Sequence, residues 1–187
     1  MKKVLCCIWA AALLCGCAQN EGNSVQTSVP ESAVEAAGPK TTIRIYDETI
    51  TLPCKYKELK HITIDRQRSI DVSTENGVGY GYANYDDKCF GLICIDNYDD
   101  SGENGENYVV EIEVDSHDMD SEIAIEYMGL SFASSAEDVK SVFGEPEKEQ
   151  FGEAGGHMVF HLSEENDWLV RIYFVFDKIT KITIKAF

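Results

Sequence analysis

Apolar and polar residues alternate along most of the chain from Thr41 onward. Successive side chains of a strand point to opposite faces of a sheet, so this alternation predicts half-buried β-strands. Asp86, Asp87 and Lys88 separate two of the segments and predict a hairpin. Nine segments share the pattern: 42–46, 50–52, 77–85, 89–97, 108–115, 123–128, 157–162, 169–176 and 179–187.

Two short stretches have helical features instead. Pro53 precedes a predicted short helix over 54–60. Ser134 and Glu137 have the spacing of a capping box, which predicts the start of a second helix. Gly144 follows this helix and is expected to end it. Three apolar residues fall on one face of the second helix: Ala136, Val139 and Phe143.

Together these elements predict an α+β fold, in which short helices pack on one face of an antiparallel sheet. Residues 41–187 are enough for one globular domain with a sizeable core. Each half contains a predicted helix followed by a meander, so two pseudo-repeated halves, 41–128 and 129–187, are an alternative description.

The first seventeen residues follow another pattern. Lys2 and Lys3 precede an apolar run that ends in Leu14-Cys15-Gly16-Cys17. This layout is typical of a bacterial lipoprotein signal peptide over residues 1–16, in which Cys17 is acylated with chains such as palmitate. It predicts a lipid anchor in the bilayer, on the extracytoplasmic side of the cell membrane.

Two alternatives for this leader remain open. A transmembrane helix over its 14 apolar or small residues would be about 21 Å long, short of a bilayer core of roughly 30 Å. A cleaved secretory signal without a lipid is the stronger alternative. Residues 17–40 follow as the lipidated cysteine and a small, polar stretch without aromatic residues, which predicts a flexible tether.

Charge narrows the range of partners. The full chain has 16 basic and 33 acidic side chains; loss of the leader removes two lysines and gives a net charge of −19. Such a surface repels nucleic acid and anionic headgroups, so neither is an expected ligand. Solubility outside the cell explains the charge, with a basic partner or loosely held divalent cations as alternatives.

Three cysteines remain in the mature chain: Cys54, Cys89 and Cys94. One disulfide with a free thiol and three free thiols are both compatible with their spacing. Neither a zinc spacing nor a redox Cys-x-x-Cys motif is present, and no cofactor is expected.

No nucleophile elbow, phosphate loop or dinucleotide fingerprint occurs in the sequence. His157 and His161 would share one face of a strand, so a metal pair is conceivable, but ordinary strand residues are the favoured interpretation. The acid-rich stretch 96–106 resembles a calcium loop, but Tyr108 stands where a bidentate glutamate is required. Solvated loops are the preferred interpretation of 96–106 and of 115–122.

The most suggestive surface is formed by Tyr80, Tyr82 and Tyr85. On a strand Tyr80 and Tyr82 would share one face and leave glycine on the other. Tyrosines are effective protein-binding residues, which makes these three candidates for a binding surface. The alternative, which the pattern favours, places the tyrosines in the core.

The segment from Gly129 to Pro146 reads GLSFASSxxDVxxxFGxP. It resembles a motif of the outer-membrane-assembly lipoproteins of the SmpA/OmlA type and of folds like the β-lactamase inhibitor protein. The likeness covers residues 129–187, and Ala133 departs from the glycine of many relatives. The resemblance implies binding or scaffolding by a curved sheet, with no catalytic residues to transfer.

These observations predict a membrane-anchored, non-catalytic binding or scaffolding module for a protein or envelope component. A small accessory hydrolase or a metal-binding lipoprotein with a dispersed site is the alternative.

Overall fold

A computed structural model describes most of the predicted globular region, within a compact unit that spans Glu35–Phe187. The predicted leader 1–16, Cys17 and the tether as far as residue 39 lie outside the described residues. No helix in the described part of the chain is both long and apolar enough to cross a membrane. The described residues are 40–65, 68, 71–73, 77–97, 107–117, 119, 124–163 and 166–186.

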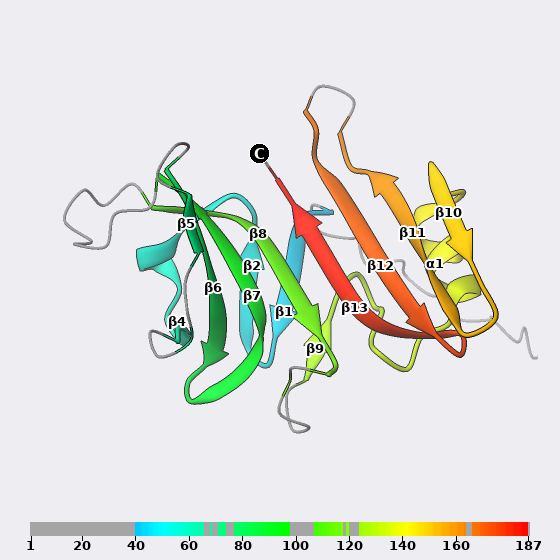
Figure 1. The fold of residues 1–187 in the computed structure, drawn as a ribbon, viewed down its shortest axis with the longest axis horizontal. Helices are drawn as coiled ribbons and strands as arrows, with labels where there is room; N and C mark the ends of the chain where they lie inside the picture. The colour runs from blue at the N-terminus through cyan, green and yellow to red at the C-terminus, as the bar shows by residue number, and fades with distance from the viewer. Residues whose placement is uncertain are drawn as a thin grey trace, which may run out of the picture. The chain divides into compact units, whose positions relative to one another are not determined.

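One large antiparallel sheet dominates the fold (Figure 1). Its strands follow the order β10-β11-β12-β13-β8-β7-β6-β4, while β3 pairs with β8 and β5 pairs with β6. The predicted hairpin is present as β6 and β7. The bounds are β3 Cys54–Lys55, β4 Ile62–Ile64, β5 Asp71–Ser73, β6 Val78–Tyr85, β7 Lys88–Asp96, β8 Tyr108–Asp115, β10 Lys148–Phe151, β11 Gly155–His161, β12 Leu169–Val175 and β13 Lys178–Lys185.

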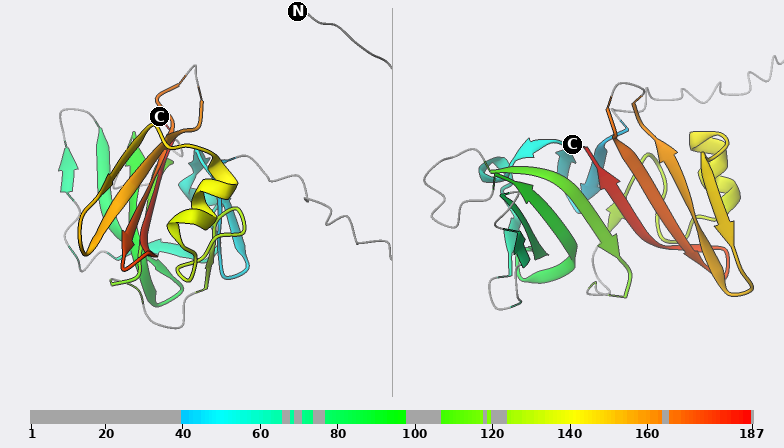
Figure 2. Two further views of the ribbon diagram at one scale, coloured as in Figure 1. Left: turned by 90° about the vertical axis from the view of Figure 1, so that its right-hand side faces the viewer. Right: turned by 45° about the horizontal axis from the view of Figure 1, so that its top comes forward.

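A second layer covers one face of this sheet. It consists of a small sheet of order β2-β1-β9 and of helix α1, both on the same side of the large sheet (Figure 2). A three-residue 3-10 helix, η1, joins β3 to β4. The bounds of these elements are β1 Thr42–Ile45, β2 Glu48–Thr51, β9 Ile125–Glu126, α1 Ala136–Phe143 and η1 Tyr56–Glu58.

The core lies between the two layers and follows directly from the alternation. Ile43 and Ile45 of β1 are at most 1 % exposed, as are Ile182 and Ile184 of β13. Helix α1 contributes the buried Val139 to the same cluster. Removing this apolar surface from water is the main stabilising term of the fold.

Helix α1 is capped one residue later than its sequence predicts. Ser135 accepts a hydrogen bond from the backbone N–H of Asp138 at 3.2 Å, and the Asp138 carboxylate accepts from the N–H of Ser135 at 2.8 Å. The Ser134 hydroxyl oxygen instead accepts from the N–H of Ser131. The helix ends before Gly144, as predicted, because this residue has a positive φ of 81°.

The α+β prediction is wrong: the fold is largely β, with one α-helix among the described residues. The segment 54–60 forms strand β3 and the three-residue η1 rather than an α-helix, since its backbone pairs with β8 and its 3-10 turn buries no residue. The alternative description as two pseudo-repeated helix-plus-meander halves fails with it, because the described part of 41–128 contains no α-helix. Strands β8 and β13 pair directly and place both halves in one sheet.

Cys54, Cys89 and Cys94 are all free thiols. Of the two alternatives compatible with their spacing, three free thiols is therefore the one that the structure has. Burial raises the pKa of Cys54 and of Cys94 to about 11. Both are therefore protonated and unreactive at neutral pH.

Candidate functional site

The second face of the large sheet points away from α1 and β1 and is called the open face here. Figure 1 views the sheet from this side. The strand register aligns the side chains of the open face in rows that cross the strands. The first row runs from β10 to β8 and contains Gln150, His157, Tyr173, Lys181 and Asp115.

Two further rows follow along the strands and extend to β6. Three of their members, Val159, Cys94 and Thr183, are at most 9 % exposed although they lie outside the main core. Neighbouring open-face side chains must therefore cover them. The second row contains Val159, Arg171, Thr183, Glu113, Leu92 and Tyr82. The third row contains His161, Leu169, Lys185, Glu111, Cys94 and Tyr80.

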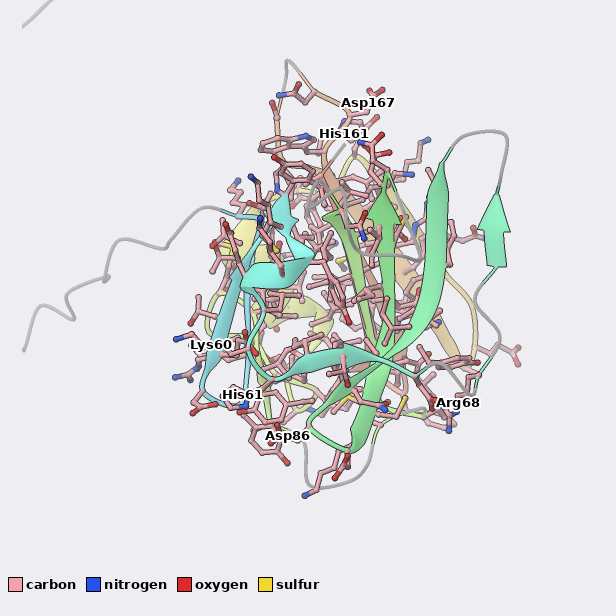
Figure 3. The ribbon with its side chains drawn as sticks, turned by 90° about the vertical axis from the view of Figure 1, so that its left-hand side faces the viewer. Lys60, His61, Arg68, Asp86, His161 and Asp167 are labelled. Carbon is pink, nitrogen blue, oxygen red and sulfur yellow. The ribbon has the colours of Figure 1, made fainter. Side chains whose placement is uncertain are left out.

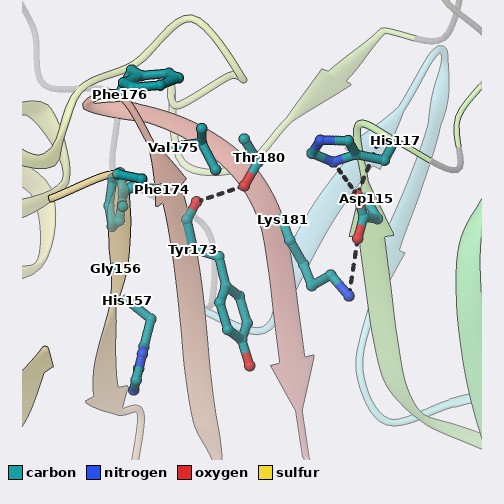
Figure 4. A pocket seen from close by; sticks show the side chains of 12 residues that line it. Asp115, His117, Gly156, His157, Tyr173, Phe174, Val175, Phe176, Thr180 and Lys181 are labelled. Carbon is teal, nitrogen blue, oxygen red and sulfur yellow. Dashed lines mark hydrogen bonds and ion pairs between the residues drawn. The ribbon is translucent and has the colours of Figure 1, made fainter. Parts of the chain in front are cut away.

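A pocket of about 590 Å³ opens on this face across β11, β12, β13 and β8. Figure 4 shows the side chains of His157, Tyr173 and Lys181 on three neighbouring strands of its lining. Val175 is the last residue of β12 and Phe176 follows it; both line the apolar end of the pocket. Val175 is 39 % exposed and Phe176 is 80 % exposed. The pocket therefore has one polar end and one apolar end.

Two glycines shape the apolar end. A Cβ on Gly156 would overlap the carbonyl oxygen of Gln150 on β10, and a Cβ on Gly155 would overlap the carbonyl oxygen of Phe174 on β12. Only glycine allows β10 and β12 to approach β11 this closely. The N–H of Phe176 donates to the carbonyl oxygen of Ala154, which joins the two hairpin tips.

A charged network forms the polar end. The Lys181 ammonium lies 2.8 Å from Glu113 and 2.9 Å from Asp115. Burial raises the pKa of Asp115, but hydrogen bonds from the His117 backbone, from Lys181 and from the His117 ring outweigh it and hold that pKa below its ordinary value. Burial lowers the pKa of Lys181, and the two carboxylates outweigh it and hold that pKa above its ordinary value.

This network predicts a pH-dependent stability term. Asp115 contributes above its ordinary pKa of 3.8 and loses this contribution as the pH falls through its depressed value. Lys181 contributes below its ordinary pKa of 10.5 and loses the contribution only as the pH rises beyond it. We expect Lys181→Met to lower the free energy of unfolding by about 1–2 kcal/mol at pH 7, because the buried Asp115 and the half-buried Glu113 lose their partner.

Urea unfolding at pH 7 and at pH 3 would measure the effect of Lys181→Met, which should shrink at the lower pH. Lys148→Met is the matched control, since Lys148 is exposed on the same face and forms no ion pair with a described residue. Equal losses for the two variants at pH 7 would contradict a stabilising role for the network.

Of the three candidate tyrosines, two lie together on the open face. Tyr80 is 39 % exposed and Tyr82 is half-buried, while Gly79 and Gly81 face the other layer and are buried. The favoured interpretation, with these two tyrosines in the core, is therefore wrong. The pKa of Tyr80 is raised to about 12 by its hydrogen bond to Cys94 and by burial.

Tyr85 belongs to the opposite face and is only 9 % exposed. Its hydroxyl donates to Asp47, and its ring packs against the rings of Tyr46 and His61. A β-bulge between Ala83 and Asn84 precedes it. Tyr85 thus has a structural role and is not available as a binding surface.

Three of the four histidines, His61, His117 and His161, are each paired with a different carboxylate. The His61 ring nitrogen lies 3.1 Å from the Asp86 carboxylate. Figure 3 shows this pair well away from His161. His161 pairs with Glu147 at 2.8 Å, while the His157 ring lies 5.6 Å from that of Tyr173. No group of three metal-ligating side chains occurs among the described residues, and residues 98–106 of the acid-rich stretch lie outside them.

The sequence carries a usable but partial signal for the open face. Period-two spacing places His157 with His161, Arg171 with Tyr173, and Lys181 with Lys185. Nothing local connects these pairs to one another, because they stand on three different strands. Which strands lie next to one another, and hence which rows form, comes from the tertiary structure.

Chemically, this arrangement is suited to binding. The described lining residues include neither serine nor cysteine. The Thr180 hydroxyl donates to the carbonyl oxygen of Tyr173 at 3.5 Å, and the His117 ring is held by Asp115. A pocket with a charged, aromatic end and an apolar end can hold a ligand that has both polar and apolar groups.

No family model, curated protein or solved structure matches this chain. The resemblance of residues 129–187 to the SmpA/OmlA type therefore stays a prediction.

Proposed function

We propose that this protein is an exported lipoprotein, anchored by acylated Cys17 on the extracytoplasmic side of the cell membrane, which binds a protein or envelope component without catalysis. The observation that carries the binding role is the pocket on the open face, with Phe176 80 % exposed at its rim. Exposed aromatic side chains beside a concave site are typical of interaction surfaces.

Site-specific photo-crosslinking tests this role in cells that express the full chain. A photoreactive phenylalanine analogue at position 176 should give adducts, because its side chain borders the pocket. The same analogue at Val142 is the control: Val142 is 36 % exposed but lies on α1, in the layer that covers the other face. Equal adduct yields at both positions, or none at position 176, would argue against binding through the open face.

The anchor has its own test. We expect Cys17→Ala to move the protein from the membrane fraction to the soluble extracytoplasmic fraction, since the variant has no thiol to acylate at the cleavage site. Cell fractionation and immunoblotting measure this change. Cys15→Ala should remain in the membrane; retention of Cys17→Ala in the membrane would rule out the predicted lipid site.

A further inference from the structure

We infer that the open face around Arg171 binds an acidic, extended segment of a partner protein. This inference rests on the proposed binding function and names the chemistry of the ligand. It is carried by the distribution of charge on the open face, by the partners of Arg171 and by the position of the apolar rim.

The first observation is a separation of charge. The chain has twice as many acidic as basic residues, yet no residue of the described strands β10 to β13 places a carboxylate on the open face. One carboxylate reaches the edge of this face from outside the strands: that of Glu147, which precedes β10 and pairs with His161. All the acidic residues of the three rows come from β8. The cations on the open face of β10 to β13 are Lys148, Arg171, Lys181 and Lys185.

The second observation is that Arg171 has no carboxylate within ion-pair distance among the described residues. Lys181 is bound by Glu113 and Asp115. Arg171 is exposed, and within the described part of the chain its guanidinium donates only to the Tyr173 hydroxyl, at 3.2 Å. Its remaining N–H groups can bind a carboxylate in the bidentate manner that a guanidinium favours. The Tyr173 hydroxyl, as the acceptor in that bond, keeps its own proton to donate to the same ligand.

The third observation favours a peptide over a sugar. A carbohydrate bound beside Arg171 would stack on the ring of Tyr173, but the Lys181 ammonium lies over that ring, 5.9 Å from its centroid. The His157 ring is tilted against the same ring at 5.6 Å. Tyrosine and arginine beside exposed apolar side chains are instead enriched at the centres of protein interfaces.

The spacing along β12 specifies the segment further. Arg171 and the apolar rim residue Val175 lie on the same face of β12, four residues apart. This spacing corresponds to about 13 Å along the strand. An extended peptide that lies along β12 would meet both if an aspartate or glutamate and a large apolar residue stand four positions apart. Alternate side chains of such a peptide point to the same side, which suits an even spacing.

The test uses an array of synthetic peptides in a serine and threonine background, probed with the full chain in detergent micelles. Each peptide carries one phenylalanine and one glutamate, two, four or six positions apart, and has a partner with glutamine in place of glutamate. We expect the strongest binding at a spacing of four, with loss of binding in the glutamine partner. Arg171→Gln should weaken binding at least about tenfold, and Arg171→Lys should restore part of it.

Lys57→Gln is the control for Arg171→Gln, since Lys57 is an exposed cation on η1. An unchanged melting curve for Arg171→Gln would show that the variant folds. Equal binding by Arg171→Gln and the wild type, or equal binding of glutamate and glutamine peptides, would overturn the acidic ligand. Such a result, with position-176 adducts still forming, would leave the proposed function intact.

Two other outcomes would also decide against the inference. Binding of polygalacturonate that depends on Arg171, without binding of any peptide, would assign the face to an anionic glycan. Absence of both peptide binding and position-176 adducts would remove the proposed function together with the inference.

Discussion

Replacing Gly91 with alanine is expected to lower the free energy of unfolding by about 4 kcal/mol, because the added methyl group overlaps a neighbouring strand and the backbone conformation is strained for alanine. Gly91 lies in the middle of β7 with a positive φ of 152°. A Cβ there would overlap the carbonyl oxygen of Glu113 and lie 2.9 Å from its carbonyl carbon and 3.1 Å from the Cα of Val114. The obstacle is backbone, so β7 and β8 must separate to accept the methyl group.

Thermal unfolding followed by circular dichroism would measure the loss in Gly91→Ala as a drop in Tm of about 8–16 °C. Gly144→Ala provides the matched control: Gly144 also has a positive φ, of 81°, but a Cβ added there would meet no atom within 4 Å. That variant should lose about 1 kcal/mol from backbone strain alone. If both variants lose the same amount, the close approach of β7 and β8 is not what requires glycine.

The second large effect is expected at Tyr127, which is fully buried where the layers meet. Its hydroxyl donates to the carbonyl oxygen of Lys40 at 2.6 Å, and its ring lies 5.7 Å from that of Phe143 on α1. Tyr127→Ala should lower the free energy of unfolding by about 3–5 kcal/mol, because it leaves a cavity and an unpaired carbonyl group. Urea unfolding at pH 7 measures this loss.

Tyr127→Phe separates the hydroxyl from the ring and should cost only about 1 kcal/mol. Burial raises the pKa of Tyr127 far above its ordinary value of 10.0. The folded protein therefore keeps this proton after the unfolded chain has lost it, and stability falls as the pH rises beyond 10. Tyr127→Phe should reduce that slope by about 1.4 kcal/mol per pH unit; an unchanged slope would contradict burial of the hydroxyl.

The alternation of the chain predicted most of the large sheet. Strands β6, β7, β8, β11, β12 and β13 lie within or close to the segments expected from sequence. Strand β10 was missed because all four of its side chains are exposed and no alternation marks it. Strand β4 was missed because it is only three residues long.

The helical predictions show the limits of local signals. The stretch 54–60 has an apolar spacing that suits a helix, but the pairing of Cys54 with Val109 on β8 fixes its backbone as strand. In α1, Ser134 and Ser135 are both suitable caps. Only Ser135 has Asp138 in position to complete the reciprocal hydrogen bonds, and Ser134 is bound by the backbone of Ser131 instead.

For the candidate site, sequence identified Tyr80 and Tyr82 as a shared face but paired them with Tyr85. The β-bulge after Ala83 and the contacts with Asp47 and His61 accompany the burial of Tyr85. No local signal indicated that Arg171 would stand on the same open face as the two tyrosines, because their neighbours in the sheet come from distant parts of the chain.

By itself, the sequence determined the alternation that makes strands, the end of α1 at Gly144, the acidic charge and the prediction of a lipid anchor at Cys17. These depend on residues close together in the chain. The tertiary structure alone decided that β8 pairs with β13, which face of each strand is covered, and that Arg171 forms no ion pair with a described residue. The reason is physical: a strand presents two faces and two edges, and only its neighbours decide which of them remain open to a partner.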